Sequence, residues 1–246
     1  MYSLDRPLLS LRLMTAASVV EAFALAFWSF QLAPQAHHNW RAKSTVGLSS
    51  AMMMAWSLGS LCTALASIGA RLGILFILQP NIFLVFSLGC WAQQPYYHRS
   101  KQRGVVQGAL AVIFFAGAEV SGALLLLGNN INNDINSWPL VLVNVFSIAF
   151  FVWGFIPQYR EIYQSRSVAG ISRHFLTIDM TGAVLSVVAL SLHPPVGYLA
   201  AGSYIAVFVL DGGILLISFC FPSASPLPVP SAPTDLPLPS VELLNK

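Results

Sequence analysis

The hydrophobic positions of the chain fall into long blocks, and short polar segments that carry most of the charge separate these blocks. A helix that spans a membrane needs about 20 mainly apolar residues, because each residue adds about 1.5 Å to its length. Seven blocks meet this requirement. They predict transmembrane helices at 13–33, 47–68, 72–93, 105–127, 139–158, 174–192 and 197–221. The pattern therefore predicts an all-α membrane protein with seven transmembrane helices.

Composition agrees with this prediction and narrows the classes of function. Of the 246 residues, 56% are hydrophobic and only 9% are charged, against about 25% charged residues in ordinary soluble domains. No basic face or aromatic-basic motif points to nucleic acid as a partner. The five histidines do not cluster at metal-ligand spacing, and the chain has no Gly-rich phosphate loop and no nucleophile elbow. We therefore expect no enzyme activity, no cofactor and no metal site.

The distribution of Lys and Arg predicts the orientation, since cytosolic loops carry more of these residues than loops on the other side. The loops after the first, third and fifth spans contain eight of them, and the opposite side contains three, Arg6, Arg12 and Arg71. The eight are Arg41, Lys43, Arg99, Lys101, Arg103, Arg160, Arg166 and Arg173. The N-terminal segment 1–12 is therefore predicted on the lumenal or external side, and the C-terminus in the cytosol.

The last segment, 222–246, is rich in Pro and Ser, and it is predicted to be a disordered cytosolic tail with polyproline II character. Pro230 and Pro233 form a PxxP pattern, which arises easily in any Pro-rich tail. A solvated tail is the favoured interpretation, and a cytosolic partner that binds the tail is the alternative.

Two stretches of the chain match each other at an offset of 123 residues, which indicates an internal duplication. LAPQAHHNWRAKSTVGLSSAMMMAWSLG begins at Leu32, and FIPQYREIYQSRSVAGISRHFLTIDMTG begins at Phe155. The matched pairs are Pro34 and Pro157, Gln35 and Gln158, Lys43 and Arg166, Ser44 and Ser167, Gly47 and Gly170, Ser49 and Ser172, and Gly59 and Gly182. The offset crosses an even number of spans, so both copies face the same way. We predict two parallel three-helix repeats at 13–93 and 139–221, joined by a cytosolic loop and linker helix at 94–127 and a lumenal loop at 128–138.

The paired Pro-Gln motifs predict two hinges near the cytosolic face. A proline inside a helix removes one backbone donor and displaces the carbonyl four residues earlier. The glutamine that follows can satisfy freed backbone groups. A proline can also simply end a span, but its presence in both copies favours the hinge. The hinge residues are Pro34, Gln35, Pro157 and Gln158.

Four carboxyl groups lie inside predicted spans, and no Lys or Arg lies deep in any of these spans. They belong to Glu21, Glu119, Asp179 and Asp211. Each buried charge costs about 2.5–3.5 kcal/mol on insertion scales. Protonation, a water-filled cavity or a bound cationic group relieves this cost, so the acids point to proton or cation traffic. The alternative is a protonated acid that binds a neighbouring helix by a hydrogen bond. The pattern favours function for the two aspartates and leaves both interpretations open for the two glutamates.

These motifs resemble those of the PQ-loop family, which includes cystinosin, the lysosomal and vacuolar exporters of basic amino acids and, more distantly, the SWEET sugar carriers. The resemblance covers residues 13–221 and looks closest to a poorly characterised fungal branch. In cystinosin-like members an Asp-x-Thr-Gly stretch follows the second PQ loop, and the stretch from Asp179 to Gly182 resembles it. The resemblance implies proton coupling at Asp179, and at Asp211 in the last span.

The resemblance also suggests residues that contact the substrate. The third span contains Gln79-Pro80-Asn81, where cystinosin-type members place a polar residue near the lumenal end. Exporters of basic amino acids carry Trp-x-x-Gly-Asp in the first repeat, but here the stretch from Trp56 is followed by Ser60, which speaks against arginine or lysine. The acids of the first and fourth spans speak for a cationic substrate. The candidate substrate-binding residues are Asn81, Glu21, Glu119, Trp56 and Thr181.

The sequence thus predicts a proton-coupled transporter of small polar metabolites, above all amino acids, that works from an acidic vacuolar or lysosomal lumen to the cytosol. Its expected partners are the lipid bilayer, protons and a small-molecule substrate. An uncoupled, SWEET-like sugar facilitator is one alternative. A receptor or scaffold without transport activity, like the KDEL receptor with its related fold, is the other.

Overall fold

The computed structural model describes residues 5–45, 48–128, 137–165, 173–192 and 198–220, which form eight α-helices and no β-strand. The helices are α1 (Asp5–Gln31), α2 (Ala33–Ala42), α3 (Ser50–Gly69), α4 (Ile74–His98), α5 (Lys101–Gly128), α6 (Trp138–Ser165), α7 (Arg173–Leu192) and α8 (Tyr198–Cys220). The Pro-rich tail at 222–246 and residues 166–172, which include part of the second copy of the repeated motif, lie outside the described residues.

Seven helical segments of the described chain are long and apolar enough to cross a membrane, so the predicted seven spans are confirmed. They are Met14–Ala42, Ser50–Gly69, Ile74–His98, Lys101–Gly128, Trp138–Gln164, Phe175–Leu192 and Ala201–Cys220. Both α4 and α6 extend several residues beyond the predicted ends at 93 and 158. Hydropathy reports the part of a helix that suits hydrocarbon, whereas helical hydrogen bonding continues through polar residues into the headgroup region.

The helices pack in pairs that the internal duplication relates to each other. The offset of 123 residues makes α1, α3 and α4 the counterparts of α6, α7 and α8. Between the copies, α1 packs on α7 and α3 packs on α6. Within the copies, α3 packs on α4 as α7 does on α8, and α1 packs on α4 as α6 does on α8. A two-copy arrangement predicts such matching contacts. The parallel direction of the copies in a membrane stays a prediction.

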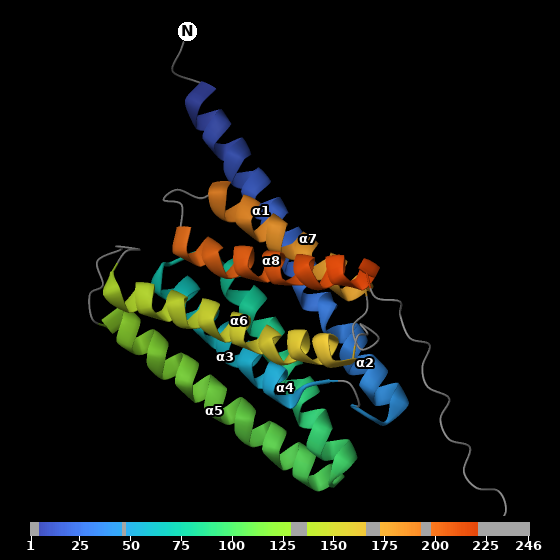
Figure 1. The fold of residues 1–246 in the computed structure, drawn as a ribbon. Coiled ribbons are helices and arrows are strands. Elements are labelled where there is room, and N and C mark those ends of the chain that lie inside the picture. Colours follow the sequence, from blue (N-terminus) through green and yellow to red (C-terminus); the bar gives the residue numbers. More distant parts are fainter. Residues whose placement is uncertain (1–4, 46–47, 129–136, 166–172, 193–197, 221–246) are drawn as a thin grey trace, which may run out of the picture.

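The helix without a counterpart, α5, lies at one edge of the bundle and packs against α4 and α3, while α7 and α8 lie at the opposite edge (Figure 1). Its outward face is apolar: Leu110, Ile113, Phe114 and Leu124 are each more than 60% exposed. Soluble monomers rarely expose a continuous apolar face of this kind, whereas lipid covers it. The surface therefore supports the conclusion from the sequence that the bundle lies in a membrane.

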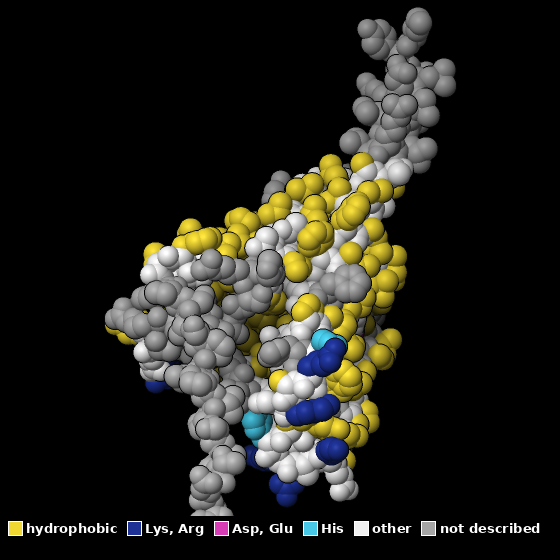
Figure 2. Space-filling model, turned by 90° about the vertical axis from the view of Figure 1, so that its right-hand side faces the viewer, with side chains coloured by type: hydrophobic (Ala, Val, Ile, Leu, Met, Phe, Trp, Pro, Cys, Tyr) yellow, Lys and Arg dark blue, Asp and Glu magenta, His cyan; other side chains and the backbone are white. Residues whose placement is uncertain are grey.

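Positive side chains gather at the end of the molecule farthest from the N-terminus. Figure 2 shows dark blue Lys and Arg side chains at this end, below a face covered by hydrophobic side chains. Arg41 lies in the last turn of α2, Arg99 directly follows α4, and Lys101 begins α5; all three are exposed. This end contains the loops that the sequence assigns to the cytosol, and the orientation itself stays a prediction.

The two PQ motifs differ in backbone structure. In the first copy α1 ends at Gln31, the backbone bends at Leu32, and Pro34 lies in the first turn of α2. Proline fits there because the N–H groups of a first helical turn have no partner within the helix. In the second copy Pro157 lies inside α6, which continues without a break. The first proposed hinge thus coincides with a helix break, and the second lies in a continuous helix.

Candidate functional site

A closed site at the centre of the bundle receives side chains from six helices. Its walls are Trp28 and Gln31 from α1, Trp56 from α3, Phe83 from α4, Phe151 and Phe155 from α6, Asp179 from α7 and Val207 from α8. The linker helix α5 contributes none of these residues. The site, called the central site below, therefore lies where the helices of the two copies meet.

Two carboxyl groups meet beside the central site. Asp179 and Asp211 lie within hydrogen-bonding reach of each other, and their side chains are 2% and 0% exposed. Neither carboxyl oxygen of Asp211 accepts a hydrogen bond from a donor group in the described part of the chain. Two ionised carboxylates in contact repel each other, whereas a proton on either one turns the contact into an O–H···O hydrogen bond. The pair is therefore a place where a proton can be held or released, and neither carboxyl faces the surrounding lipid.

Gln31 links this carboxyl pair to the first PQ motif. With its amide nitrogen turned toward Asp179, Gln31 donates to Asp179 Oδ1 at 2.7 Å and lies 3.2 Å from Oδ2. Gln31 is 1% exposed and is the last residue of α1, directly before the bend at Leu32. A movement of α1 at this bend therefore changes the surroundings of Asp179.

The second PQ motif also reaches the carboxyl pair. Tyr159, which directly follows Gln158 in α6, donates its hydroxyl to the Leu210 carbonyl oxygen at 2.6 Å. Leu210 precedes Asp211 in α8. Gln158 itself is buried, with 4% of its side chain exposed. Each copy thus provides one polar contact, one to the side chain of Asp179 and one to the backbone beside Asp211.

Aromatic rings enclose the rest of the central site. The centroid of the Trp28 ring lies 5.5 Å from that of Phe83 and 5.2 Å from that of Tyr204. The Trp56 ring lies 5.9 Å from Phe83 and 5.3 Å from Phe155. The space between these side chains has no room for a water molecule, so the bundle is closed at this level.

The two indole nitrogens at this closed site lack acceptors. Trp28 Nε1 and Trp56 Nε1 are buried and have no hydrogen-bond partner in the described part of the chain. A buried donor without a partner costs about 1–3 kcal/mol. Entry of water or of a polar solute would provide acceptors, so these donors favour an opened and occupied state of the site.

Two glycines let the rings approach neighbouring helices. A methyl group on Gly182 of α7 would overlap Trp28 Cδ1, and one on Gly59 of α3 would lie 3.1 Å from the Phe151 ring. Gly59 and Gly182 are counterparts in the repeat, and so are Trp28 and Phe151. The same helix-to-ring contact therefore occurs twice between the copies, with the roles of the copies exchanged.

Hydroxyl groups connect the helices around the central site. Thr63 Oγ1 lies 2.7 Å from Ser147 Oγ, which lies 3.1 Å from Ser203 Oγ. Ser186, the counterpart of Thr63, accepts a hydrogen bond from Gln79 Nε2 at 2.9 Å. These buried groups have partners within the protein, so they fix helix packing rather than offer contacts to a solute.

The structure puts two candidate residues in a separate pair. Asn81 Nδ2 donates to Glu119 Oε1 at 2.9 Å and to the Ile77 carbonyl oxygen at 3.0 Å. This pair joins α4 to α5, and neither residue lines the central site. The amide of Asn81 stabilises the Glu119 carboxylate between the two helices by this hydrogen bond. The pair therefore suits a structural role, the attachment of the linker helix α5 to α4.

Two other candidates also lie outside the central site. Glu21 is buried beside Gly73, where an added Cβ would lie 3.6 Å from the carboxylate. Gly73 is the N-cap of α4, and a carboxylate near a helix N-terminus is stabilised by the helix dipole. Thr181 donates its hydroxyl to the Thr177 carbonyl oxygen of its own helix at 2.7 Å. Of the five candidate substrate contacts, only Trp56 lines the central site.

The contacts of Gln31 and Trp28 were missed from the sequence, but in the structure the repeat relates one of them to a contact in the other copy. Trp56 and Asp179 are counterparts, and so are Gly154 and Gln31. An added Cβ on Gly154 would lie 2.6 Å from Trp56 Nε1, so this pair touches as Gln31 and Asp179 do. Among the described residues, no group of three or more His, Cys, Asp or Glu is arranged to hold a metal ion.

Comparison with known proteins shows which family and which relatives the sequence is similar to. A family model described as PQ loop repeat matches residues 16–75 and 140–194, which contain both Pro-Gln pairs and Asp179. An uncharacterized protein of Schizosaccharomyces pombe is 30% identical over 208 residues, which cover 84% of this chain and 73% of the relative. An uncharacterized membrane protein of Saccharomyces cerevisiae is 27% identical over 179 residues, which cover 72% of this chain and 58% of the relative.

Proposed function

Because the chain belongs to the PQ loop repeat family and is an integral, multi-pass membrane protein, we propose that it carries small polar solutes across the membrane together with protons. The proposed solutes are amino acids, and the proposed direction is from an acidic vacuolar or lysosomal lumen to the cytosol. In this proposal Asp179 and Asp211 hold and release the proton.

The contact between Asp179 and Asp211 at the centre of the bundle carries the proposal. Ionisable groups within a membrane are costly, and proton relays are among the functions for which they are kept. A pair that shares a proton keeps a hydrogen bond in the dry, closed site, whereas a fully ionised pair needs water or a cationic group beside it. The protonation state therefore selects between a closed and an open arrangement of the surrounding helices.

The break in α1 offers a way in which the protonation state could change the arrangement of the helices. Gln31 donates to Asp179, and the bend at Leu32 and the proline at Pro34 follow at once. A change in the hydrogen bonding of the carboxyl pair would therefore act directly on Gln31, at the end of α1. The paired motif at Pro157 and Gln158 offers the corresponding position in the second copy. Opening at these two positions would admit solute to the central site from one side at a time.

The lining of the central site suits a solute with an ammonium group. The faces of Trp and Phe rings attract a cation, and Trp does so most strongly. Asp179 supplies a counter-ion in the same wall. The indole N–H groups of Trp28 and Trp56 are donors that a solute carboxylate can accept from. An α-amino acid carries both groups, whereas a neutral sugar carries neither.

Uptake into proteoliposomes with an imposed pH gradient tests the proposal, with a panel of labelled amino acids and sugars. We expect gradient-driven uptake of an amino acid by the wild type, and a loss of about tenfold or more for Asp179→Asn, because asparagine keeps the size of the side chain but does not titrate. Glu119→Gln is the matched control: it also removes a carboxyl group from a span, but its partner Asn81 holds it between α4 and α5.

Three other results would lead to different conclusions. Uptake of a sugar that depends on neither the pH gradient nor Asp179 would favour the uncoupled facilitator. Solute binding without any uptake would favour a receptor. Equal loss of uptake in Asp179→Asn and Glu119→Gln would mean that any missing carboxyl group damages the bundle, and the proton role of Asp179 would have no support.

A further inference from the structure

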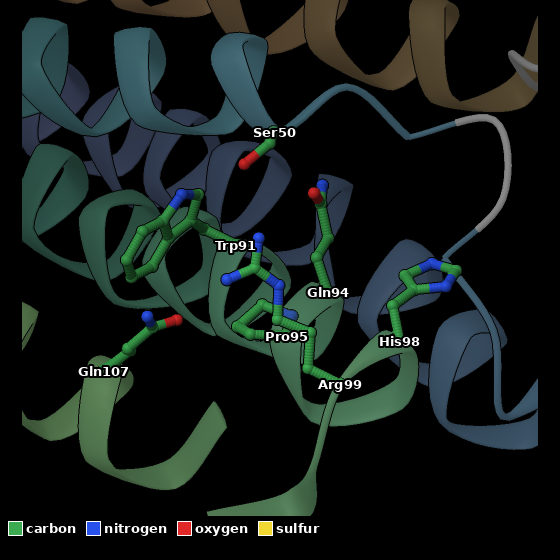
Figure 3. A pocket seen from close by; sticks show the side chains of 7 residues that line it. All are labelled: Ser50, Trp91, Gln94, Pro95, His98, Arg99 and Gln107. Carbon is green, nitrogen blue, oxygen red and sulfur yellow. The ribbon is translucent and has the colours of Figure 1, made fainter. Parts of the chain in front are cut away.

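A second pocket opens to the surface between α3, α4 and α5, at the end of the bundle where the positive side chains gather (Figure 3). It has a volume of about 410 Å³ and shares no residue with the central site. Its polar and aromatic walls are Ser50 of α3, Trp91, Gln94 and His98 of α4, Arg99 directly after α4, and Gln107 of α5.

The described residues that line the pocket offer a positive charge and hydrogen-bond donors, and none of them is a carboxylate. Figure 3 shows the Arg99 guanidinium pointing into the pocket toward Trp91, with Gln107 reaching toward the same ring from α5. The side chains of Arg99 and Gln107 have no hydrogen-bond or ion-pair partner among the described residues. Between Glu21 and Glu119 the sequence contains no Asp or Glu at all. The pocket is therefore complementary to an anion.

The backbone adds to this preference. Ser50, in the wall of the pocket, is the first residue of α3, and the first N–H groups of a helix have no partner within that helix. These groups and the helix dipole favour negative charge at this end of α3. Of these groups, the N–H of Met52 donates to the Ser49 side chain at 3.3 Å. Among the described residues, the N–H groups of Ser50 and Ala51 have no acceptor, so they can donate to a ligand.

The pocket lies at the level along the bundle where lipid headgroups are expected. At this end α4 leaves its apolar span through the residues QQPYYH, and Trp91 lies two residues before them. Trp and Tyr at the ends of spans are typical of the membrane interface. Val106 and Leu110, which flank Gln107 on α5, are 49% and 61% exposed. The pocket is thus continuous with an apolar surface that acyl chains can cover.

We propose that this pocket binds the phosphate-bearing headgroup of an anionic phospholipid from the leaflet on this side of the membrane. Arg99 pairs with the phosphate, Gln107 and the start of α3 donate hydrogen bonds to it, and the acyl chains lie along α5. Basic pockets between transmembrane helices bind lipid headgroups in this way. A soluble phosphate has the same headgroup chemistry, but it gains nothing from the apolar surface beside the pocket.

Occupation of the pocket would also stabilise the chain after the first PQ motif, because Gln94 and His98 form hydrogen bonds with it. Gln94 Nε2 donates to the Leu48 carbonyl oxygen at 3.1 Å, and His98 Nε2 lies 2.9 Å from Thr45 Oγ1. The preceding Gln93 exchanges two hydrogen bonds with α2. A headgroup that orders Gln94 and His98 therefore also holds Thr45 and Leu48, which lie between α2 and α3.

The test uses the purified full chain in detergent, with phosphatidylinositol, phosphatidylserine or phosphatidylcholine added. Native mass spectrometry measures bound lipid, and thermal unfolding measures stabilisation. We expect the wild type to bind the two anionic lipids preferentially and to unfold at a higher temperature with them. Arg99→Gln should lower their affinity by about tenfold, because a charge-assisted hydrogen bond to phosphate is lost. Arg103→Gln removes an equal charge from an exposed position outside the pocket lining, and should keep wild-type affinity.

Equal weakening by the two arginine variants would attribute the effect to net charge and overturn the pocket. Equal stabilisation of the wild type by inorganic phosphate or inositol phosphate would overturn the lipid in favour of a soluble anion. If Arg99→Gln does not fold, Gln107→Leu removes a donor from the opposite wall without altering α4. Unchanged preference for anionic over zwitterionic lipid in that variant would contradict the proposal as well.

Discussion

At the scale of single residues, two glycines allow close contact between the copies of the repeat. Gly182 faces the Trp28 ring and Gly59 faces the Phe151 ring, and both rings belong to the walls of the central site. Each glycine removes the one atom that would hold the two helices apart. The position of the ring, and with it the width of the central site, therefore depends on the absence of a Cβ.

We expect Gly182→Ala to destabilise the protein by about 1–3 kcal/mol, because the new methyl group overlaps Trp28 Cδ1 inside a packed core. Gly117→Ala is the matched control: a Cβ at that position meets nothing within 4 Å. Alanine is also a better helix former than glycine by up to about 1 kcal/mol, so the control should be neutral or slightly stabilising. Thermal unfolding in detergent measures both variants, and equal midpoints would contradict the proposed contact.

The residues of the central site show where sequence reasoning ends. Asp179 and Asp211 stand out in the sequence because a carboxyl group in an apolar run is costly. Their contact does not, because the distance between residues of different helices depends on how the helices pack. Gln31 looks like an ordinary polar residue at the end of a span, and only the folded chain brings its amide to Asp179. The repeat pairs Trp56 with Asp179, but a shared position does not reveal which neighbours the two residues touch.

At the scale of elements, the segment after the first proline was predictable in part. Hydropathy marks seven spans because each must match the hydrocarbon thickness. It cannot detect α2, whose sequence APQAHHNWRA is polar and whose place depends on hydrogen bonds to Gln93 in α4. The predicted backbone disturbance at the first PQ motif appears as a bend at Leu32, while the same motif at Pro157 leaves α6 continuous. The identical pair thus gives two backbone outcomes, a helix break in the first copy and a continuous helix in the second.

We expect Pro34→Ala to slow transport by about tenfold while leaving solute binding intact. Alanine restores a backbone N–H and is the best helix former, so it favours a continuous helix through Leu32 and hinders the opening at this position. Pro34→Gly also restores the N–H but disfavours the helix by about 1 kcal/mol, so it should keep most of the transport rate. Initial uptake rates and equilibrium binding of the same solute separate the two effects. Wild-type rates in Pro34→Ala would mean that the break is not used as a hinge.

At the scale of the whole molecule, the bundle is asymmetric in charge along its length although its helices pack in matching pairs. The positive residues that follow α2 and α4 lie at one end, together with the pocket between α3, α4 and α5, while Arg71 lies between α3 and α4 at the other end. Cytosolic loops carry the excess of Lys and Arg in most membrane proteins. The orientation matters for the proposed function, because in that proposal it decides on which side the carboxyl pair would release its proton.

The two ends of α5 provide a direct test of that orientation. This helix has 28 residues, from Lys101 to Gly128, and a helix of that length extends about 42 Å, well beyond a hydrocarbon core of about 30 Å. Both end residues are exposed, so Lys101→Cys and Gly128→Cys can each report on one side of the membrane once Cys62, Cys90 and Cys220 are replaced.

With an impermeant maleimide added to intact organelles, we expect labelling of Lys101→Cys at once and of Gly128→Cys only after permeabilisation. The reverse pattern would invert the orientation, and a lumenal proton would then meet the carboxyl pair from the end that contains the PQ motifs. Immediate labelling of both positions would contradict α5 as a span. Since α5 alone lacks a counterpart in the other copy, the two copies could not then face the same way, and the proposed alternation between two equivalent halves would lose its geometric basis.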